Sequence, residues 1–383
     1  MKFDATSLAN GSVTFFGHYD FDVRPKGISP RRLPDWTRNQ IPEMMNAVVR
    51  MPSGVRMVFE SDADTIELQV QTTRIVYPPQ RPRPVVFDLK VDGHLVDSYS
   101  SENGNTILID RMNPQDYKME KGEDYRVNFS DLGTHVKRCE IWLPHNAFVE
   151  IQELDLSNAK IVNPVHPPLE GRWLHYGSSI SHCMEAEKPT GSWPAVAAEI
   201  NKLHLHNLGF GGQCHLDQFV ARTIRDTPTD LITIKAGINV INMDSMRERV
   251  FIPTLHGFLD TIREGQPNTS IVLMSPIFCP SAETQPGPTV QDSTGKFVTL
   301  KGHEEIQVGC LTLTRVREVI AELVEIRQQA GDKNLFYMDG LTLFGEDDAI
   351  DLPDDLHPNP EGYKRMGQRF AAAIVGCVNT IAR

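Results

Sequence analysis

Two short segments carry side chains whose types and spacing suit nucleophilic chemistry. HYGSSIS contains Ser179 directly after a turn-forming glycine, and DLPDDLHPNPEGY holds Asp354 and His357 three residues apart. A serine hydroxyl is a poor nucleophile until a base takes its proton, and imidazole is the side chain that does this most often. A carboxylate beside the imidazole can fix its tautomer and stabilise its charged form. We therefore expect Ser179 as nucleophile, His357 as base and Asp354 as its acidic partner.

Two further segments could stabilise the negative charge that such an attack creates. NLGFGGQ presents Gly212, whose lack of a side chain lets the backbone N–H approach a ligand closely, and KAGIN presents the amide of Asn239. Together with the N–H of Ser179, these groups would form an oxyanion hole. The glycine-rich segment does not fit a dinucleotide fingerprint, because Cys214 stands where the third glycine belongs.

Each segment alone also has an ordinary structural explanation. A serine after glycine is usually a turn residue, a glycine pair a turn, and a loop asparagine a cap. His357 next to Pro358 could be plain surface, and Asp354 with Asp355 a solvated acidic pair. The combination is more specific, because the segments either follow successive predicted strands or precede the final predicted helix. Ligands of open parallel sheets bind at the carboxyl ends of the strands.

The elements that would position these residues alternate between strand and helix. Helical patterns begin near Ser192, His215, Met243, His303 and Pro360. The apolar strand runs between them are RWLHYG, HLHNLG, DLITIKAG, SIVLMSPIF and NLFYMDG. This alternation predicts a doubly wound parallel sheet in a three-layer α/β fold.

The first half of the chain has a different pattern. Short runs rich in Val, Ile and Phe are separated by turn residues, and little repeats at helical spacing. These runs are VRMVFES, TIELQVQTTRIVY, PVVFDLKVDG, DYRVNFS, RCEIWLP and AFVEIQELDL. They predict an all-β, antiparallel, jelly-roll-like sandwich. The Pro-rich stretch Asn163 to Gly171 reads as a linker, so we expect a β-sandwich accessory domain over 1–165 and a catalytic domain over 166–383.

From about Gly171 onward the chain resembles the SGNH (GDSL) hydrolases. Ser179, Gly212 and Asn239 match the family's serine, glycine and asparagine, and the D-x-x-H pair matches its last block. The family usually has Asp before its nucleophile, where this chain has Ser178, and Ser181 is a rival nucleophile. The first half looks like the accessory domain of two-domain carbohydrate acetylesterases. The resemblance implies a serine esterase that acts through an acyl-enzyme.

Charge and composition exclude several classes of partner. The formal net charge of −12 argues against binding to nucleic acid and to an anionic membrane surface. The N-terminal segment lacks the basic and apolar regions of a signal peptide, and no apolar run reaches the roughly 20 residues of a membrane span. The six scattered cysteines read as free thiols, although an even number leaves disulfides possible. We expect a cytoplasmic protein.

Two alternatives concern the chemistry itself. His204 and His206 could face one way like metal ligands, but no Cys, Asp or Glu completes a set, so we expect no metal and no cofactor. Cys183 and Cys214 flank the candidate loops and could supply a thiol nucleophile, although buried structural cysteine is commoner.

The expected substrate is a short acyl ester, most simply acetyl, on a small-molecule or carbohydrate carrier. The segment from Pro280 to Gly302 is polar and lacks the amphipathic face of a lipase lid; it reads as a loop beside the site or a remote solvent loop. Trp193 could line the site or pack in the core. An acyltransferase with the same site and an inactive carbohydrate-binding protein remain the alternatives.

Overall fold

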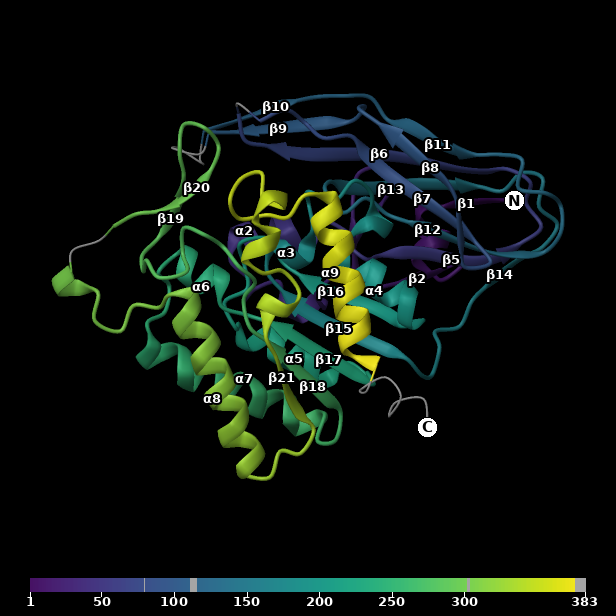
Figure 1. The fold of residues 1–383 in the computed structure, drawn as a ribbon. Helices are drawn as coiled ribbons and strands as arrows, with labels where there is room; N and C mark the ends of the chain where they lie inside the picture. Colours follow the sequence, from purple (N-terminus) through teal and green to yellow (C-terminus); the bar gives the residue numbers. More distant parts are fainter. Residues whose placement is uncertain (79, 111–115, 302–303, 376–383) are drawn as a thin grey trace. The chain divides into compact units, whose positions relative to one another are not determined.

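Apolar runs that are buried in the interior build a five-stranded parallel sheet in the second half of the chain. The computed structural model describes residues 1–78, 80–110, 116–301 and 304–375 (Figure 1). The sheet has the order β16-β15-β17-β18-β21. Its strands are β15 (Arg172–Gly177), β16 (His204–Gly209), β17 (Leu231–Lys235), β18 (Ser270–Met274) and β21 (Leu335–Met338). All five strands lie within the predicted runs, and all pair in parallel.

Helices cover both faces of this sheet. From β15, Trp173 packs against Trp193 of α4 (Trp193–Asn201) and Phe370 of α9 (Pro360–Ala373). Tyr176, of opposite parity in the same strand, stacks on Phe258 of α7 (Glu248–Gly265). Successive side chains of a strand point to opposite faces, so these helices form separate layers and the three-layer α/β fold is confirmed. The other helices are α3 (Ser179–His182), α5 (Gln218–Asp226), α6 (Ile238–Asn242) and α8 (Leu313–Gln329).

Some predicted helix starts differ from the observed ones. The helix expected near Met243 begins at Glu248, because the short α6 precedes it and ends at Asn242. His303 lies outside the described residues, and the helix expected there, α8, begins at Leu313 with Thr312 as its cap. Short 3-10 turns η2 to η5 occupy Pro189–Gly191, Glu304–Ile306, Gly340–Thr342 and Glu346–Asp351.

The chain forms two compact units, and the first contains a short segment from later in the sequence. Unit 1 comprises Met1–Pro167 with Glu187–Thr190, and unit 2 comprises Pro168–Ala186 with Gly191–Arg383. Within unit 1, the backbone N–H and hydroxyl of Thr190 donate to one carboxylate oxygen of Asp88 at 3.0 and 2.6 Å.

Unit 1 consists of two sheets, as expected for a β-sandwich. One contains β10-β9-β6-β13-β4-β3 with β1 and β11, and the other contains β14-β5-β12-β7-β8 with β2. The first sheet has β1 (Lys2–Asp4), β3 (Asp20–Val23), β4 (Ile28–Arg31), β6 (Ile66–Val76), β9 (Asn105–Ile109), β10 (Tyr117–Glu120), β11 (Tyr125–Phe129) and β13 (Phe148–Asp155). The second has β2 (Thr14–Phe16), β5 (Arg56–Ser61), β7 (Val85–Val91), β8 (His94–Ser101), β12 (Lys137–Trp142) and β14 (Val162–Pro164).

The pairing in unit 1 departs from the expected antiparallel pattern at one place. Strands β6 and β9 pair in parallel. The chain leaves the first sheet after β6, forms the β7–β8 hairpin in the second sheet and returns as β9. This crossover lets β9 run in the same direction as β6, which a direct hairpin could not do.

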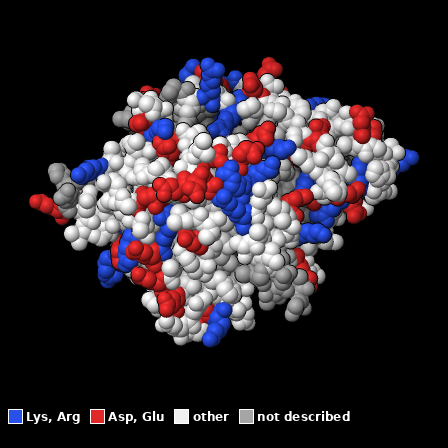
Figure 2. Space-filling model, in the orientation of Figure 1, with Lys and Arg blue, Asp and Glu red and all other residues white. Residues whose placement is uncertain are grey.

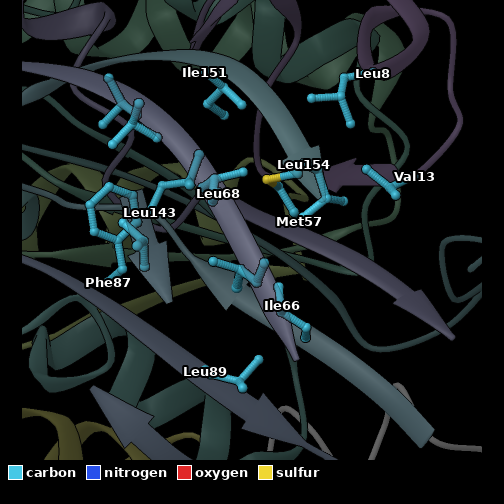
Figure 3. Close-up of a cluster of buried hydrophobic side chains, with 14 of the residues drawn as sticks. Leu8, Val13, Met57, Ile66, Leu68, Phe87, Leu89, Leu143, Ile151 and Leu154 are labelled. Carbon is cyan, nitrogen blue, oxygen red and sulfur yellow. The ribbon is translucent and has the colours of Figure 1, made fainter. Parts of the chain in front are cut away.

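One hydrophobic core lies between the two sheets of unit 1. Inward residues of β5 and β7, such as Met57 and Phe87, contact inward residues of β6 and β13, such as Leu68 and Leu154 (Figure 3). These side chains are fully buried. Burial of this kind contributes roughly 25 cal/mol per Å² of apolar surface, which makes the shared core the main reason that the sheets stay paired.

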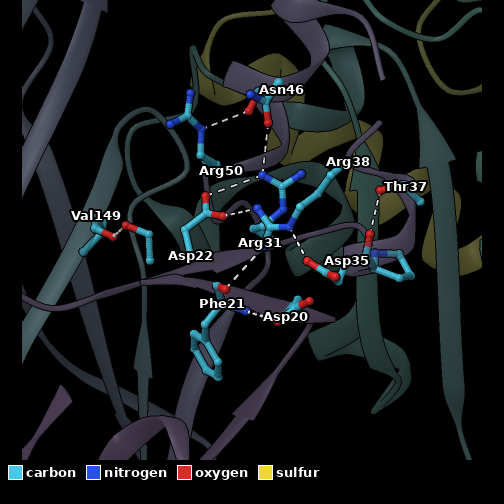
Figure 4. A network of polar contacts seen from close by, with 12 residues as sticks. Asp20, Phe21, Asp22, Arg31, Asp35, Thr37, Arg38, Asn46, Arg50 and Val149 are labelled. Carbon is cyan, nitrogen blue, oxygen red and sulfur yellow. Dashed lines mark hydrogen bonds and ion pairs between the residues drawn. The ribbon is translucent and has the colours of Figure 1, made fainter. Parts of the chain in front are cut away.

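A polar network joins β3, β4 and α2 (Glu43–Val49) of the same unit. The carboxylate of Asp22 contacts the guanidinium groups of Arg31 and Arg38, and Arg31 also donates to the side-chain oxygen of Asn46 at 3.0 Å (Figure 4). Arg50 donates to the backbone oxygen of Asn46 at 3.0 Å. Arg31 is almost fully buried, so the carboxylate compensates a charge removed from water. The remaining helical segments are α1 (Ala5–Ala9) and η1 (Asp35–Thr37).

Acidic and basic side chains are interspersed on the face that Figure 2 shows. This face shows no broad basic surface, in keeping with the net charge of −12. Among the described residues, no helix is both long and apolar enough to cross a bilayer.

Candidate active site

Ser179 opens a one-turn helix directly after the first strand of the parallel sheet. The strand β15 ends at Gly177, and the hydroxyl of Ser178 caps α3 by accepting from the N–H of Ile180 at 3.3 Å. A Cβ atom at Gly177 would collide with the hydroxyl of Ser181, so the turn requires glycine. Ser178, at the position where the SGNH hydrolases that the sequence resembles usually have Asp, supports the turn through its hydrogen bond with Ile180. Ser179 is half-buried, whereas its neighbours Ser178 and Ile180 are buried.

The structure brings Ser179, His357 and Asp354 together although the serine and the histidine are 178 positions apart in the sequence. The hydroxyl oxygen of Ser179 lies 2.9 Å from Nε2 of His357. Nδ1 of the same ring lies 2.7 Å from Oδ2 of Asp354. Oδ1 of Asp354 accepts from the backbone N–H groups of Leu356 and His357 at 3.0 and 2.7 Å. These bonds fix the carboxylate, and the carboxylate fixes the imidazole.

The surroundings keep Asp354 ionised. Burial by itself would raise the pKa of this carboxyl, but the hydrogen bond and charge of His357 and the two backbone N–H donors outweigh it. The pKa of Asp354 therefore lies below its usual range. An ionised carboxylate accepts the Nδ1–H and leaves Nε2 as the basic nitrogen that faces Ser179.

The turn that carries Gly212 lies against Ser179. A Cβ at the preceding residue, Gly211, would lie 3.8 Å from the Cβ of Ser179. Gly212 has a φ of +69°, the left-handed region that favours glycine, and open space lies where its side chain would be. No hydrogen bond among the described residues uses the N–H of Ser179 or Gly212, so both donors are available.

Asn239 is oriented by a hydrogen bond to the same turn. Its Oδ1 accepts from the N–H of Cys214 at 2.9 Å, which leaves the amide nitrogen pointing elsewhere as a donor. Asn239 lies in α6, and Gly237 precedes that helix with a φ of +121°, a conformation that side chains rarely permit. Asn239 is 4% exposed, so its amide lies in a largely desolvated place.

The rival nucleophile Ser181 also has a histidine partner, but it is sealed from solvent. Its hydroxyl lies 2.7 Å from Nε2 of His175, whose Nδ1 lies 2.7 Å from the hydroxyl of Thr233. Ser181 and His175 are both 0% exposed. Burial, with the charge of Lys235, lowers the pKa of His175 to about 3, so the ring is neutral. No substrate can reach this pair without a rearrangement.

The thiol alternative is disfavoured by burial. Cys183 and Cys214 are fully buried. Burial raises the pKa of Cys214 to about 12 and that of Cys183 well above its usual value. Thiolates are the nucleophilic form, so these residues are in the wrong state for attack. Trp193 is also fully buried and packs in the core between Trp173 and Phe370, so its role is structural.

The histidine pair of β16 lies on an edge strand. His204 and His206 alternate with the buried Leu205 and Asn207 and are themselves half-buried. Over the part of the chain that the structure describes, no three His, Cys, Asp or Glu side chains come together in a way that could hold a metal ion.

Sequence reasoning did not single out two residues, Phe297 and His175, that lie next to the candidate site. The stretch after β18 forms a small hairpin of β19 (Thr289–Gln291) and β20 (Phe297–Thr299), and the ring of Phe297 packs against His357. The remote solvent loop is therefore the wrong reading of this stretch. The other residue is His175, an isolated polar residue in the predicted buried strand RWLHYG that bonds to Ser181 beneath the nucleophile's helix. A titratable group in an apolar run was the available signal.

One family model matches the second half of the chain, and several solved structures resemble nearly the whole chain. The model of the GDSL-like lipase/acylhydrolase family matches residues 175–365. The solved salicylyl-acyltransferase SsfX3 from a tetracycline biosynthetic pathway is 25% identical with a TM-score of 0.80, over 98% of this chain and 97% of that one. A putative GDSL-like lipase from Bacteroides ovatus is 18% identical with a TM-score of 0.70, over 99% and 98%.

A family two carbohydrate esterase from Clostridium thermocellum, solved with cellohexaose, is 14% identical with a TM-score of 0.60, over 95% of this chain and 98% of that one. These solved structures extend over both units of the chain. Among curated protein sequences, none matches. The matched segment contains the whole triad and both further oxyanion candidates, in the order in which the sequence resembles the SGNH hydrolases. Residues 175–365 thus form a domain of the GDSL-like lipase/acylhydrolase family, and the chain belongs to the SGNH hydrolases.

Proposed function

We propose that this protein is a serine esterase that removes short acyl groups, most simply acetyl, from a polar carrier through an acyl-enzyme. The observation that carries the proposal is the continuous chain from the Ser179 hydroxyl through His357 to Asp354, with steps of 2.9 and 2.7 Å. A nucleophile bonded to a base, and a base bonded to an ionised carboxylate, is the arrangement that acyl transfer needs.

Each residue then has one task. Nε2 of His357 takes the hydroxyl proton while the oxygen of Ser179 attacks the ester carbonyl. The resulting oxyanion accepts from the N–H groups of Ser179 and Gly212 and from the Asn239 amide, and one such donor is worth about 3–4 kcal/mol in the transition state. His357 next gives its proton to the departing alcohol, and the acyl group stays on Ser179. Water activated by the same imidazole releases the acid and restores the hydroxyl.

The carrier that we propose is a sugar or a glycosylated metabolite. The tip of the hairpin beside His357 is polar, with Asp292, Ser293 and Thr294 between the two short strands. Such a surface suits a hydroxylated carrier better than a lipid. The carbohydrate esterase solved with cellohexaose shares the two-unit fold, which supports the same carrier class.

Acyl transfer to an alcohol is the second candidate function. It is favoured by the salicylyl-acyltransferase, whose identity of 25% and TM-score of 0.80 exceed those of the carbohydrate esterase. The same acyl-enzyme would form on Ser179, and an acceptor hydroxyl would replace water in the second step.

Analysis of products separates these possibilities. The protein is incubated with an acetylated sugar, with and without an excess of a second sugar or alcohol, and acetate and new ester are quantified. We expect acetate as the main product under both conditions. New ester as the main product would establish the transferase. No turnover and no acyl adduct in a folded sample would instead support the third alternative, an inactive carbohydrate-binding protein.

We further assign catalysis to the second domain, an accessory role to the β-sandwich, and a cytoplasmic location to the protein. The five cysteines in the described part of the chain are free thiols, and four of them are buried. Free thiols are the usual state in a reducing compartment. The sixth, Cys377, lies outside the described residues. We propose that the protein needs no metal and no cofactor and that it binds neither nucleic acid nor membranes.

A further inference from the structure

Phe297 lies beside the histidine that we propose as proton carrier. Its ring meets the imidazole of His357 edge to face, with the ring centroids 5.5 Å apart and the planes at 74°. Its backbone N–H donates to the carbonyl oxygen of Asp354 at 2.8 Å. Phe297 is only half-buried, so part of it remains accessible next to the triad.

The hairpin that carries Phe297 is fixed on two sides. In β19, the hydroxyl of Thr289 donates to the side-chain oxygen of Asn242 at 3.0 Å, and Asn242 ends the helix that carries Asn239. Next to β20, Lys296 forms an ion pair of 3.0 Å with Asp355. The hairpin therefore links α6, which carries Asn239, to the loop that carries Asp354 and His357. These bonds fix the position of Phe297.

The direction of proton transfer determines where the leaving alcohol lies relative to Phe297. Nε2 of His357 must deliver its proton to the leaving oxygen, so that oxygen has to come within hydrogen-bond reach of the imidazole. The oxyanion must instead face the donors on Ser179, Gly212 and Asn239. The carrier attached to the leaving oxygen is thus on the imidazole side of the reacting carbon, where the hairpin lies.

From this arrangement, and resting on the proposed function, we propose that Phe297 binds the carrier: its ring contacts the flat face of a ring on the departing alcohol. An accepting alcohol that attacks the acyl-enzyme takes the same place, because it follows the reverse path of the leaving alcohol. Both a sugar ring and an aromatic ring offer such an apolar face. The acyl group does not enter this contact.

The test compares three acetyl esters that differ only in their alcohol. Ethyl acetate has no ring, 4-nitrophenyl acetate has an aromatic ring, and an acetylated methyl glucoside has a sugar ring. We expect Phe297→Ala to lower kcat/KM for at least one ring-bearing ester about tenfold more than it lowers kcat/KM for ethyl acetate, which is the size of one lost aromatic contact. The ring-bearing ester whose kcat/KM falls more shows whether Phe297 contacts an aromatic ring or a sugar ring. Phe297→Tyr, which keeps the ring, should retain the activity of the original protein.

Val298→Ala is the matched control. Val298 follows Phe297 in the same short strand, and its side chain points to the opposite face of the hairpin. It should leave all three esters unchanged. Equal losses for all esters in Phe297→Ala would overturn the inference, because the ring would then act by positioning His357. If the unmodified protein cleaves no ester, the proposed function fails and the inference falls with it.

Discussion

In the proposed mechanism, His357 and Asp354 contribute unequally to kcat. Loss of His357 removes the group that carries the proton, whereas loss of Asp354 leaves a basic imidazole without its anchor. By analogy with other triads, His357→Ala should lower kcat by on the order of 10⁶ and Asp354→Ala by on the order of 10⁴. Steady-state hydrolysis of an acetyl ester measures both. Equal losses in the two variants would contradict the assigned roles.

The lowered pKa of Asp354 predicts how stability depends on pH. The folded-state pKa is below the unfolded one, so the carboxylate stabilises the fold at neutral pH and this contribution is lost as the pH falls through the folded pKa. Compared with Asp354→Asn, the original protein should lose its advantage in free energy of unfolding as the pH falls below about pH 4. Urea unfolding at several pH values measures this advantage. An advantage that does not shrink below about pH 4 would argue against an ionised Asp354.

At the scale of elements, a buried hydrogen-bond network holds the helix of the nucleophile. The hydroxyl of Ser181 bonds to His175, and the amide of Asn207 in β16 donates to the backbone oxygen of Ser181 at 2.9 Å. His175 in turn contacts Thr233 of β17, so three strands help to fix α3. This network explains a buried Ser–His pair without a catalytic role.

Ser181→Ala tests that explanation. The change leaves Nε2 of His175 without its partner inside the protein, which should cost about 1–3 kcal/mol of stability. Chemical denaturation measures the cost, and labelling with a fluorophosphonate measures the nucleophile. We expect a destabilised protein that is still labelled. Loss of the label in a folded Ser181→Ala sample would revive Ser181 as nucleophile.

The longer strands that bury apolar side chains were predictable, whereas exposed strands and very short strands such as β2 and β4 were not. The strand β15 coincides with the run RWLHYG because its residues are largely buried between two helical layers. The strand β8 was not among the predicted runs, since nearly all of its residues are exposed and its sequence shows no apolar alternation. The hairpin of β19 and β20 has only three residues in each strand. It is held by contacts to α6 and to the loop of Asp354, and no local sequence pattern reveals such contacts.

At the scale of the whole molecule, the two folds could be predicted, and so could the residues that meet in the candidate site. Ser179 and His357 are far apart in the sequence, yet each lies in a segment whose place at the edge of a parallel sheet follows from topology. The segment Glu187–Thr190 could not be assigned to unit 1 from the sequence, because its bonds to Asp88 depend on the folded chain.

The composition of the stretch from Pro280 to Gly302 predicts a preference for short acyl groups. Few large apolar residues are present to cover a long chain, and the glycine turn from Gly209 to Gly212 offers little side-chain wall. We expect acetyl and propionyl esters of 4-nitrophenol to be cleaved far faster than octanoyl esters, as kcat/KM across the series will show. A rise of kcat/KM beyond the hexanoyl ester would exclude this preference.

The central claim, that Ser179 is the nucleophile of an acyl-transfer site, is tested most directly by covalent labelling. The protein is treated with a fluorophosphonate, digested, and the modified residue is located by mass spectrometry. The account predicts one adduct on Ser179, absent from Ser179→Ala, which should retain the original melting temperature and lose turnover. An adduct that persists in a folded Ser179→Ala sample, on Ser178, Ser181 or any other residue, would contradict it.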